Sequence, residues 1–169
     1  ITVQELVARG RYPHQPLFTR WRKEDEEAVT RAMKATGITD LAQQSVDTLS
    51  GGQRQRAWIA MVLAQETAIM LLDEPTTWLD ISHQIDLLEL LSELNREKGY
   101  TLAAVLHDLN QACRYATHLI ALRDGKIVAE GAPKEIVNAA LIEKIYGLRC
   151  TIIDDPVAHT PLVVPLGRK

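Results

Sequence analysis

Three short stretches of the chain carry side chains that could bind phosphate and a divalent cation. The first reads Leu-Ser-Gly-Gly-Gln at residues 49–53 and directly precedes a helical pattern. Two glycines let backbone amides approach a ligand, Ser50 adds a hydroxyl, and the start of a helix adds partial positive charge. We therefore predict an anion site at Ser50, Gly51, Gly52 and Gln53. An ordinary capped helix start remains the alternative, because Ser and Gly are common there for structural reasons.

The second stretch is an acidic pair, Asp73 and Glu74, that follows the apolar run 68–72. A carboxylate at the end of a strand can hold Mg²⁺, often through water. The adjacent carboxylate can orient or deprotonate an attacking water. We therefore predict Asp73 as the metal residue and Glu74 as a catalytic residue. The alternative is that both acids only begin a loop and cap the next helix.

The third group consists of Asp80, which precedes a helix, and His107, which ends a second apolar run. Each residue by itself also has a purely structural interpretation. Asp80 could simply cap a helix, and His107 could be a histidine whose ring is hydrogen-bonded within the fold. Their order is more telling, because a glycine-rich helix start, a buried strand, Asp-Glu, Asp, a second strand and His together form a set of phosphate and Mg²⁺ ligands. The other histidines show no ligand spacing; they are His14, His83, His118 and His159.

Alternating strands and helices are expected to position these residues. Helices are predicted at about 51–64, 82–98 and 108–115, and buried strands at 68–73 and 101–106. Strand, helix, strand indicates a parallel α/β layer, which places ligands at the carboxyl ends of its strands. Asp73 and His107 sit at two such ends. The helix at 82–98 is expected to bury a stripe formed by Ile81, Ile85, Leu88, Leu91 and Leu94.

The flanking segments are expected to be short elements. Before residue 49 we predict a helix from Thr2 to Arg9 and a surface loop over 10–22. A second helix is predicted to begin at the acidic residues Glu24 to Glu27 and to end at Gly37. After residue 115 we predict a hairpin of strands 118–122 and 126–129 around Asp124-Gly125, helices at 133–138 and 139–146, and a terminal hairpin of 151–153 with 162–164.

Composition excludes several classes of protein. The chain has 169 residues, 46% of them hydrophobic, and a net charge of −3, which is typical of a globular domain with a real core. No strong basic field would draw it to nucleic acid, so we expect no nucleic-acid partner. No apolar stretch approaches the roughly 20 residues that span a bilayer. Cys113 and Cys150 form no CxxC pair and suit a reducing compartment.

Together the motifs resemble those of ABC-transporter ATPases. Residues 49–53 match the signature motif, 69–74 look like the Walker B strand with its catalytic glutamate, 78–80 look like the D-loop, and His107 looks like the switch histidine. The resemblance implies an α/β, P-loop NTPase-like core, with a mainly parallel sheet and flanking helices, plus a helical subdomain. Stretches 9–14, 76–84, 107–112 and 154–167 are similar to the importers of iron-siderophore complexes, the first three also to those of haem and cobalamin.

The resemblance also implies roles and partners. ATP and Mg²⁺ would be the cofactors, and two copies of the subunit would face each other head to tail. Ser50 to Gln53 would contact the γ-phosphate bound to the other copy. Asp73 would hold Mg²⁺, Glu74 would act on the attacking water, and His107 would clamp the γ-phosphate. Asp80 would link the two ATP sites. Membrane permease subunits would be partners near Tyr12, Pro13 and His14, at the cytoplasmic face of a bacterial inner membrane, with a periplasmic siderophore-binding protein as an indirect partner.

One departure from the family pattern is decisive. None of the nine glycines begins a GxxxxGK[ST] phosphate loop. We therefore expect that the N-terminal part of the subunit is missing and that this chain is inactive alone. The expected division is a partial helical subdomain at 1–48, the signature motif and its helix at 49–64, and the C-terminal part of the core at 65–169. One alternative is a non-catalytic module that dimerises or contacts a permease. Another is an ABC-type ATPase of DNA repair, but the signature and Walker B motifs lie too close together here for the coiled-coil or zinc insertion that such proteins usually carry.

Overall fold

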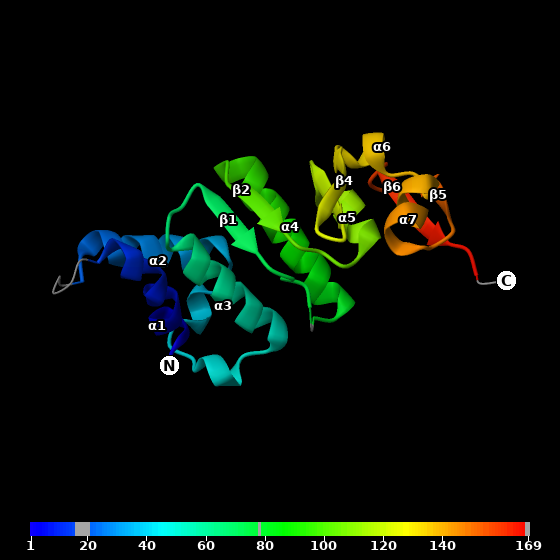
Figure 1. Ribbon diagram of the computed structural model, residues 1–169. Coiled ribbons are helices and arrows are strands. Elements are labelled where there is room, and N and C mark those ends of the chain that lie inside the picture. Colours follow the sequence, from blue (N-terminus) through cyan, green and yellow to red (C-terminus); the bar gives the residue numbers. More distant parts are fainter. Residues whose placement is uncertain (16–20, 78, 168–169) are drawn as a thin grey trace. The chain divides into compact units, whose positions relative to one another are not determined.

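The computed structural model describes residues 1–15, 21–77 and 79–167 (Figure 1). The chain divides into two compact units, residues 1–105 and 106–169. Trp78 of the predicted D-loop and residues 16–20 of the predicted surface loop lie outside the described residues.

The first unit begins with helices that pack side by side (Figure 1). They are α1 (Val3–Ala8), the 3₁₀ helix η1 (Arg9–His14) and α2 (Lys23–Ala35), followed by the short 3₁₀ helices η2 (Thr39–Leu41) and η3 (Val46–Thr48). Thr2 and Glu5 form a capping box in which each side chain accepts the other's backbone N–H, which explains why α1 begins there. The start of the expected loop over 10–22 is helical instead, as far as His14.

The rest of the first unit alternates between helix and strand. The elements in order are α3 (Gly51–Leu63), β1 (Ile69–Leu72), α4 (Ile81–Lys98) and β2 (Thr101–Ala104). β1 and β2 are parallel neighbours, with Ile69 opposite Thr101 and Leu72 opposite Ala104. This confirms the predicted strand–helix–strand unit. α4 ends at Gly99, whose φ of 70° suits glycine.

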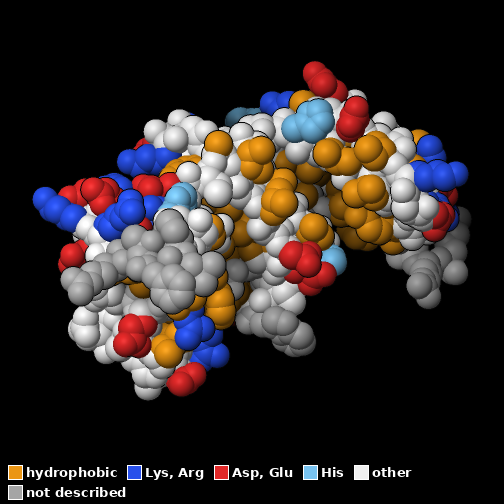
Figure 2. All heavy atoms as spheres, turned by 60° about the vertical axis from the view of Figure 1, so that its left-hand side comes forward, with side chains coloured by type: hydrophobic (Ala, Val, Ile, Leu, Met, Phe, Trp, Pro, Cys, Tyr) orange, Lys and Arg blue, Asp and Glu red, His pale blue; other side chains and the backbone are white. Residues whose placement is uncertain are grey.

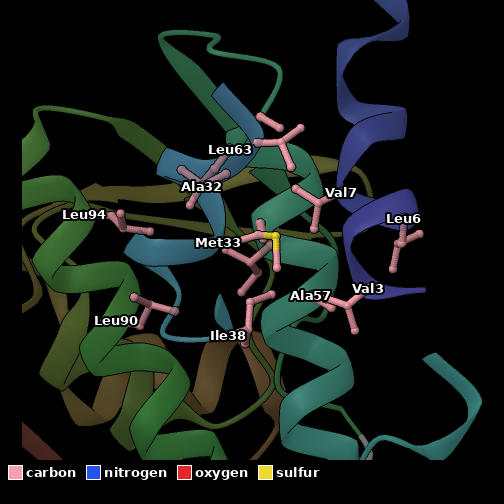
Figure 3. Close-up of a cluster of buried hydrophobic side chains, with 14 of the residues drawn as sticks. Val3, Leu6, Val7, Ala32, Met33, Ile38, Ala57, Leu63, Leu90 and Leu94 are labelled. Carbon is pink, nitrogen blue, oxygen red and sulfur yellow. The ribbon is translucent and has the colours of Figure 1, made fainter. Parts of the chain in front are cut away.

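One hydrophobic core joins the helices of the first unit (Figure 3). Met33 of α2, which is 4% exposed, lies at the centre of the side chains drawn there. Each fully buried aliphatic side chain contributes about 1.5–3 kcal/mol to stability. The labelled members are Val3, Leu6 and Val7 from α1, Ala32 and Met33 from α2, Ala57 and Leu63 from α3, Leu90 and Leu94 from α4, and Ile38.

Burial of the strands and of α4 differs in part from the expectation. Met70 is 2% exposed, whereas Ile69 and Leu71 are 59% and 75% exposed. Side chains alternate along a strand, and the described elements pack against only one face of β1, so its other face is open. At the start of α4, Ile81 is 77% exposed instead of buried, while Leu87 is 2% exposed and joins the core.

The second unit consists of short helices and two hairpins. Its elements are α5 (Leu109–Tyr115), β3 (Leu119–Arg123), β4 (Lys126–Gly131), α6 (Pro133–Ile136), α7 (Ala139–Tyr146), β5 (Cys150–Asp154) and β6 (Pro161–Pro165). β3 pairs with β4 and β5 with β6, both antiparallel, which confirms the two predicted hairpins. Asp124 and Gly125 have φ values of 49° and 72°, so both adopt the left-handed backbone of a tight hairpin turn.

The face seen in Figure 2 carries charged side chains of both signs and groups of neighbouring apolar side chains. In the part of the chain that the structure describes, no helix is long and apolar enough to cross a membrane. Cys113 and Cys150 are both buried and free.

Candidate functional site

Ser50 is the N-cap residue of α3. Its Oγ accepts the backbone N–H of Gln53 at 3.3 Å, and Oε1 of Gln53 accepts the backbone N–H of Ser50 at 3.0 Å. This capping box explains why the helix begins at Gly51. The box uses the Ser50 hydroxyl as an acceptor, so its proton can still be donated to a phosphate oxygen.

The two glycines of this helix start have different surroundings. Gly51 is exposed, and a Cβ atom added there would lie 3.7 Å from Cδ2 of Leu79, an ordinary contact. Gly52 is buried, and a Cβ atom added there would overlap Cδ2 of His83 and lie 3.0 Å from its Cγ and Nε2. Gly52 is therefore needed for the close packing of α3 on α4, whereas Gly51 faces outward where a ligand could approach.

Asp80 is the N-cap residue of α4. Its Oδ1 accepts the backbone N–H of His83 at 3.0 Å and the Ser82 hydroxyl at 2.9 Å, and it lies 2.7 Å from Nδ1 of His83. The bonds from the His83 backbone, the His83 ring and the Ser82 hydroxyl favour the ionised carboxylate and lower the pKa of Asp80 to about 2. Asp80 is therefore negatively charged at neutral pH.

Asp73 and Glu74 come directly after β1, and both are exposed. Glu74 has a φ of 47°, a left-handed backbone that costs a non-glycine residue roughly 1–2 kcal/mol. Two bonds from Thr77 hold this turn: its backbone N–H donates to the Glu74 carbonyl and its hydroxyl donates to Oε2 of Glu74, both at 3.1 Å. Strained backbone is often found at functional positions, so this conformation is consistent with the predicted catalytic role of Glu74.

His107 is exposed and belongs to the second unit. The next residue, Asp108, is the N-cap of α5, and its Oδ1 accepts the backbone N–H groups of Asn110 at 2.8 Å and Gln111 at 2.9 Å. The cap places His107 just before a fixed helix start. Its joint action with Glu74, which lies in the first unit, stays a prediction.

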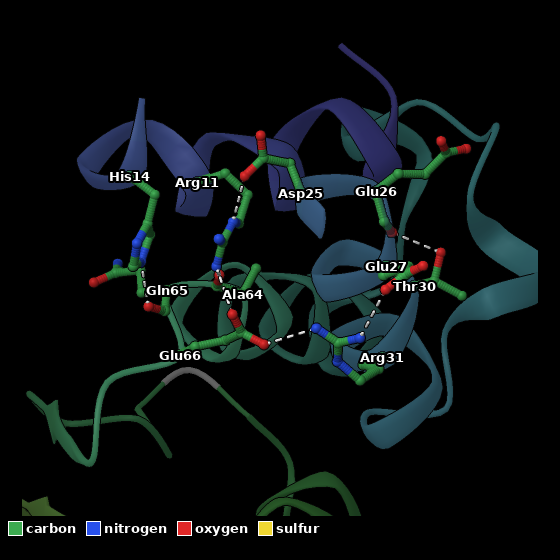
Figure 4. Close-up of polar contacts among 10 residues, drawn as sticks. All are labelled: Arg11, His14, Asp25, Glu26, Glu27, Thr30, Arg31, Ala64, Gln65 and Glu66. Carbon is green, nitrogen blue, oxygen red and sulfur yellow. Dashed lines mark hydrogen bonds and ion pairs between the residues drawn. The ribbon is translucent and has the colours of Figure 1, made fainter. Parts of the chain in front are cut away.

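The stretch that the resemblance assigns to a permease contact is held on a short helix. Tyr12, Pro13 and His14 are exposed on η1, with Tyr12 at 63%. Nε2 of His14 lies 2.7 Å from the carbonyl oxygen of Gln65, just beyond α3 (Figure 4). An exposed aromatic side chain on an anchored helix suits contact with a partner.

The structure thus joins two predicted segments that are distant in sequence. The start of α3, at Gly51 and Gly52, contacts the start of α4 through Leu79 and His83. His83 could not be recognised from metal-ligand spacing, which it lacks. The available signal was its position three residues after Asp80, which is typical of a residue on a capped first helical turn.

The described residues contain no cluster of side chains that could bind a metal ion by themselves. Within residues 1–15, 21–77 and 79–167, no group of three or more His, Cys, Asp or Glu side chains could hold a metal ion. Asp73 still presents an exposed carboxylate at a strand end. That fits Mg²⁺, which usually takes one or two carboxylates and completes its shell with water and phosphate oxygens.

The chain is similar in sequence to known ATP-binding proteins. Residues 1–77 match the family model for the ABC transporter. The chain is 93% identical over 168 residues to the ferric enterobactin transport ATP-binding protein FepC of Escherichia coli strain K12, covering 99% of this chain and 62% of that protein. It spans less than two thirds of the length of this relative and of two further curated relatives that it matches.

Two solved structures have a similar fold. One is an ABC transporter, described as of the metal-chelate type, in an inward-facing conformation; it has a TM-score of 0.90 and 28% identity and covers 99% of this chain and 68% of that one. The other is the dimeric ATP-binding cassette MJ0796 bound to ADP and phosphate, with a TM-score of 0.61, 32% identity, and coverage of 78% and 56%. The resemblance to ABC-transporter ATPases is confirmed, and the chain belongs to the ABC transporter family of ATP-binding proteins.

Proposed function

We propose that this chain is part of an ATP-hydrolysing subunit that drives uptake of an iron-siderophore complex, ferric enterobactin, across a bacterial inner membrane. The observation that carries the proposal is the 93% identity, over 99% of the chain, to a ferric enterobactin transport ATP-binding protein. The siderophore itself is inferred from that relative only.

The residues divide the work of phosphoryl transfer among them. Asp73 would hold Mg²⁺, which when bound neutralises phosphate charge. Glu74 would accept a hydrogen bond from the attacking water and orient it, while its turn is fixed by Thr77. Ser50 and the exposed backbone at Gly51 would donate to the γ-phosphate bound to the other subunit, and His107 would clamp a γ-phosphate. Such positioned donors stabilise charge that develops in the transition state.

Partners follow from the same proposal. A second copy of the subunit would supply the phosphate that Ser50 to Gln53 contact, and Asp80 would link the two sites; the dimeric cassette with a similar fold supports this arrangement. Permease subunits would bind near Tyr12, and a periplasmic siderophore-binding protein would act indirectly. The subunit would lie at the cytoplasmic face of the inner membrane. We also propose the division into a helical subdomain at 1–48, the signature segment at 49–64 and the core at 65–169.

A chimeric subunit tests the proposal. The 168 matched residues of the Escherichia coli relative are replaced by this chain and expressed in a strain that lacks the relative. We expect uptake of radiolabelled ferric enterobactin at the level of the unmodified relative, and no uptake when the chimera also carries Glu74→Gln. A chimera that accumulates normally in the membrane fraction but gives no uptake would contradict the proposal.

A binding measurement separates this function from a non-catalytic module. The 169-residue chain contains no GxxxxGK[ST] loop to cradle the β- and γ-phosphates, so we expect no tight ATP binding by the chain alone. Calorimetric titration with ATP and Mg²⁺ compares it with the chimera, which should bind. Equal micromolar affinities would show that the chain holds nucleotide by a different site.

A further inference from the structure

His83, in the first turn of α4, touches two of the predicted functional segments. Its backbone N–H and its Nδ1 lie 3.0 and 2.7 Å from Oδ1 of Asp80. Its ring also lies against the start of α3, so close to Gly52 that a single added carbon atom would overlap it.

The contact with Asp80 fixes the chemistry of the ring. An ionised carboxylate only accepts hydrogen bonds, so Nδ1 of His83 carries the proton in this contact. The bond holds both the tautomer and the orientation of the imidazole. All three bonds to the Asp80 side chain use Oδ1, which leaves the second carboxylate oxygen outside this arrangement. Asp80 is 67% exposed at its side chain, so that oxygen can be reached by a partner.

The contact between Gly52 and His83 packs the starts of α3 and α4 closely against each other. Cβ atoms in proteins are essentially never found as close to other atoms as one at position 52 would be to the ring. The start of α3 therefore cannot move toward α4 unless His83 moves, and the ring cannot rotate without losing its bond to Asp80. The side chain of His83 is 42% exposed, so it contributes little as a core residue, and its position is explained better by these two contacts.

We propose that His83 is a positioning residue that holds the Ser50–Gln53 helix start and the Asp80 carboxylate in one fixed geometry. The inference rests on the proposed function, in which both groups act at ATP sites shared between two subunits. A group displaced by about 1 Å can cost on the order of 100-fold in rate. His83 would thus affect turnover without touching ATP.

A double-mutant cycle tests the contact itself, in the chimeric subunit. We expect Gly52→Ala to lower the melting temperature by several degrees, because the methyl group collides with the ring. His83→Ala should have little effect, and the double variant Gly52→Ala/His83→Ala should regain most of the loss. Gly51→Ala is the matched control and should melt like the parent, because its methyl group makes only an ordinary contact. A double variant as unstable as Gly52→Ala would overturn the proposal.

Turnover tests the positioning role. His83→Phe keeps a planar ring against Gly52 but has no nitrogen for Asp80, and His83→Asn keeps an N–H donor but has no ring. We expect each to lower kcat about 10-fold or more, with the KM for ATP and the melting temperature close to those of the parent. A wild-type kcat in both variants would overturn the inference. If the parent chimera itself hydrolyses no ATP, the proposed function fails, and the melting cycle still decides the contact.

Discussion

Arg11 and Asp25 form an ion pair in the interior of the first unit. Nε of Arg11 lies 2.9 Å from Oδ1 of Asp25, and the two side chains are 7% and 6% exposed. The same guanidinium donates to the carbonyl oxygen of Ala64 at 2.8 Å and lies 2.9 Å from Oε2 of Glu66, whose other oxygen is 2.9 Å from Nη2 of Arg31 (Figure 4). These contacts join η1, α2 and the residues after α3.

Asp25→Ala should strongly destabilise the first unit. Removal of Asp25 leaves the Nε donor of Arg11 buried without its acceptor, while Glu66 still pairs with the guanidinium, so we expect a loss of about 1–3 kcal/mol. The free energy of unfolding in urea measures the change. Lys23→Ala is the control, since Lys23 lies on the same helical turn but is 86% exposed and 3.7 Å from its partner Glu27. Equal losses for the two variants would contradict a special role for the buried pair.

The contribution of Asp25 should depend on pH. The hydrogen bond from Arg11, which is the largest cause, lowers the pKa of Asp25 below its ordinary value, so folding favours the ionised carboxylate. The added stability is fully present above the unfolded pKa of about 3.9 and is lost as the pH falls through the lower folded pKa. The difference in unfolding free energy between the parent and Asp25→Asn should therefore shrink as the pH falls below about 4. A difference that stays constant over this range would argue against ionisation as its source.

Glu74→Gln should keep ATP binding and stop turnover. The amide can still accept a bond from Thr77 and keeps the shape of the turn, but it cannot accept a proton from the attacking water. Single-turnover hydrolysis by the chimeric subunit should slow on the order of 100-fold or more. The exposed Glu97→Gln, in the last turn of α4, is the matched control and should hydrolyse like the parent. Parental turnover in Glu74→Gln would remove Glu74 from the mechanism.

His107→Ala should lower ATP hydrolysis while the fold is kept. The side chain is exposed, and the start of α5 is capped by Asp108 and not by the histidine. A melting curve and a steady-state ATPase assay on the same preparation check this. A large fall in the melting temperature with retained specific activity would mean that the ring serves packing and not chemistry.

Features encoded within a few residues could be predicted from the sequence. The helix starts at Thr2, Ser50, Asp80 and Asp108 are each explained by bonds to backbone N–H groups two or three residues away. The pairing of β1 with β2 was predictable as well, because a helix between two apolar strands favours a parallel unit.

Features that depend on distant residues could not be predicted in this way. Arg11 was expected on a loop, yet its partners Asp25, Ala64 and Glu66 stand 14, 53 and 55 residues further along and bury it. The burial of Gly52 in α3 depends in the same way on His83 in α4, and β1 lies between these two helices in the chain. Nothing in the local pattern at either residue records the neighbour that tertiary packing supplies.

We propose that Ser50 acts on a nucleotide held by the other subunit, whereas Glu74 acts on the nucleotide held by its own subunit. Two mixed dimers of the chimeric subunit test it in single-turnover ATP hydrolysis. In the first, one subunit carries Ser50→Arg and the other Glu74→Gln; in the second, one subunit carries both substitutions and the other carries none. We predict that the first dimer hydrolyses ATP at one intact site and that the second hydrolyses none. Hydrolysis by the second dimer and none by the first would contradict the claim.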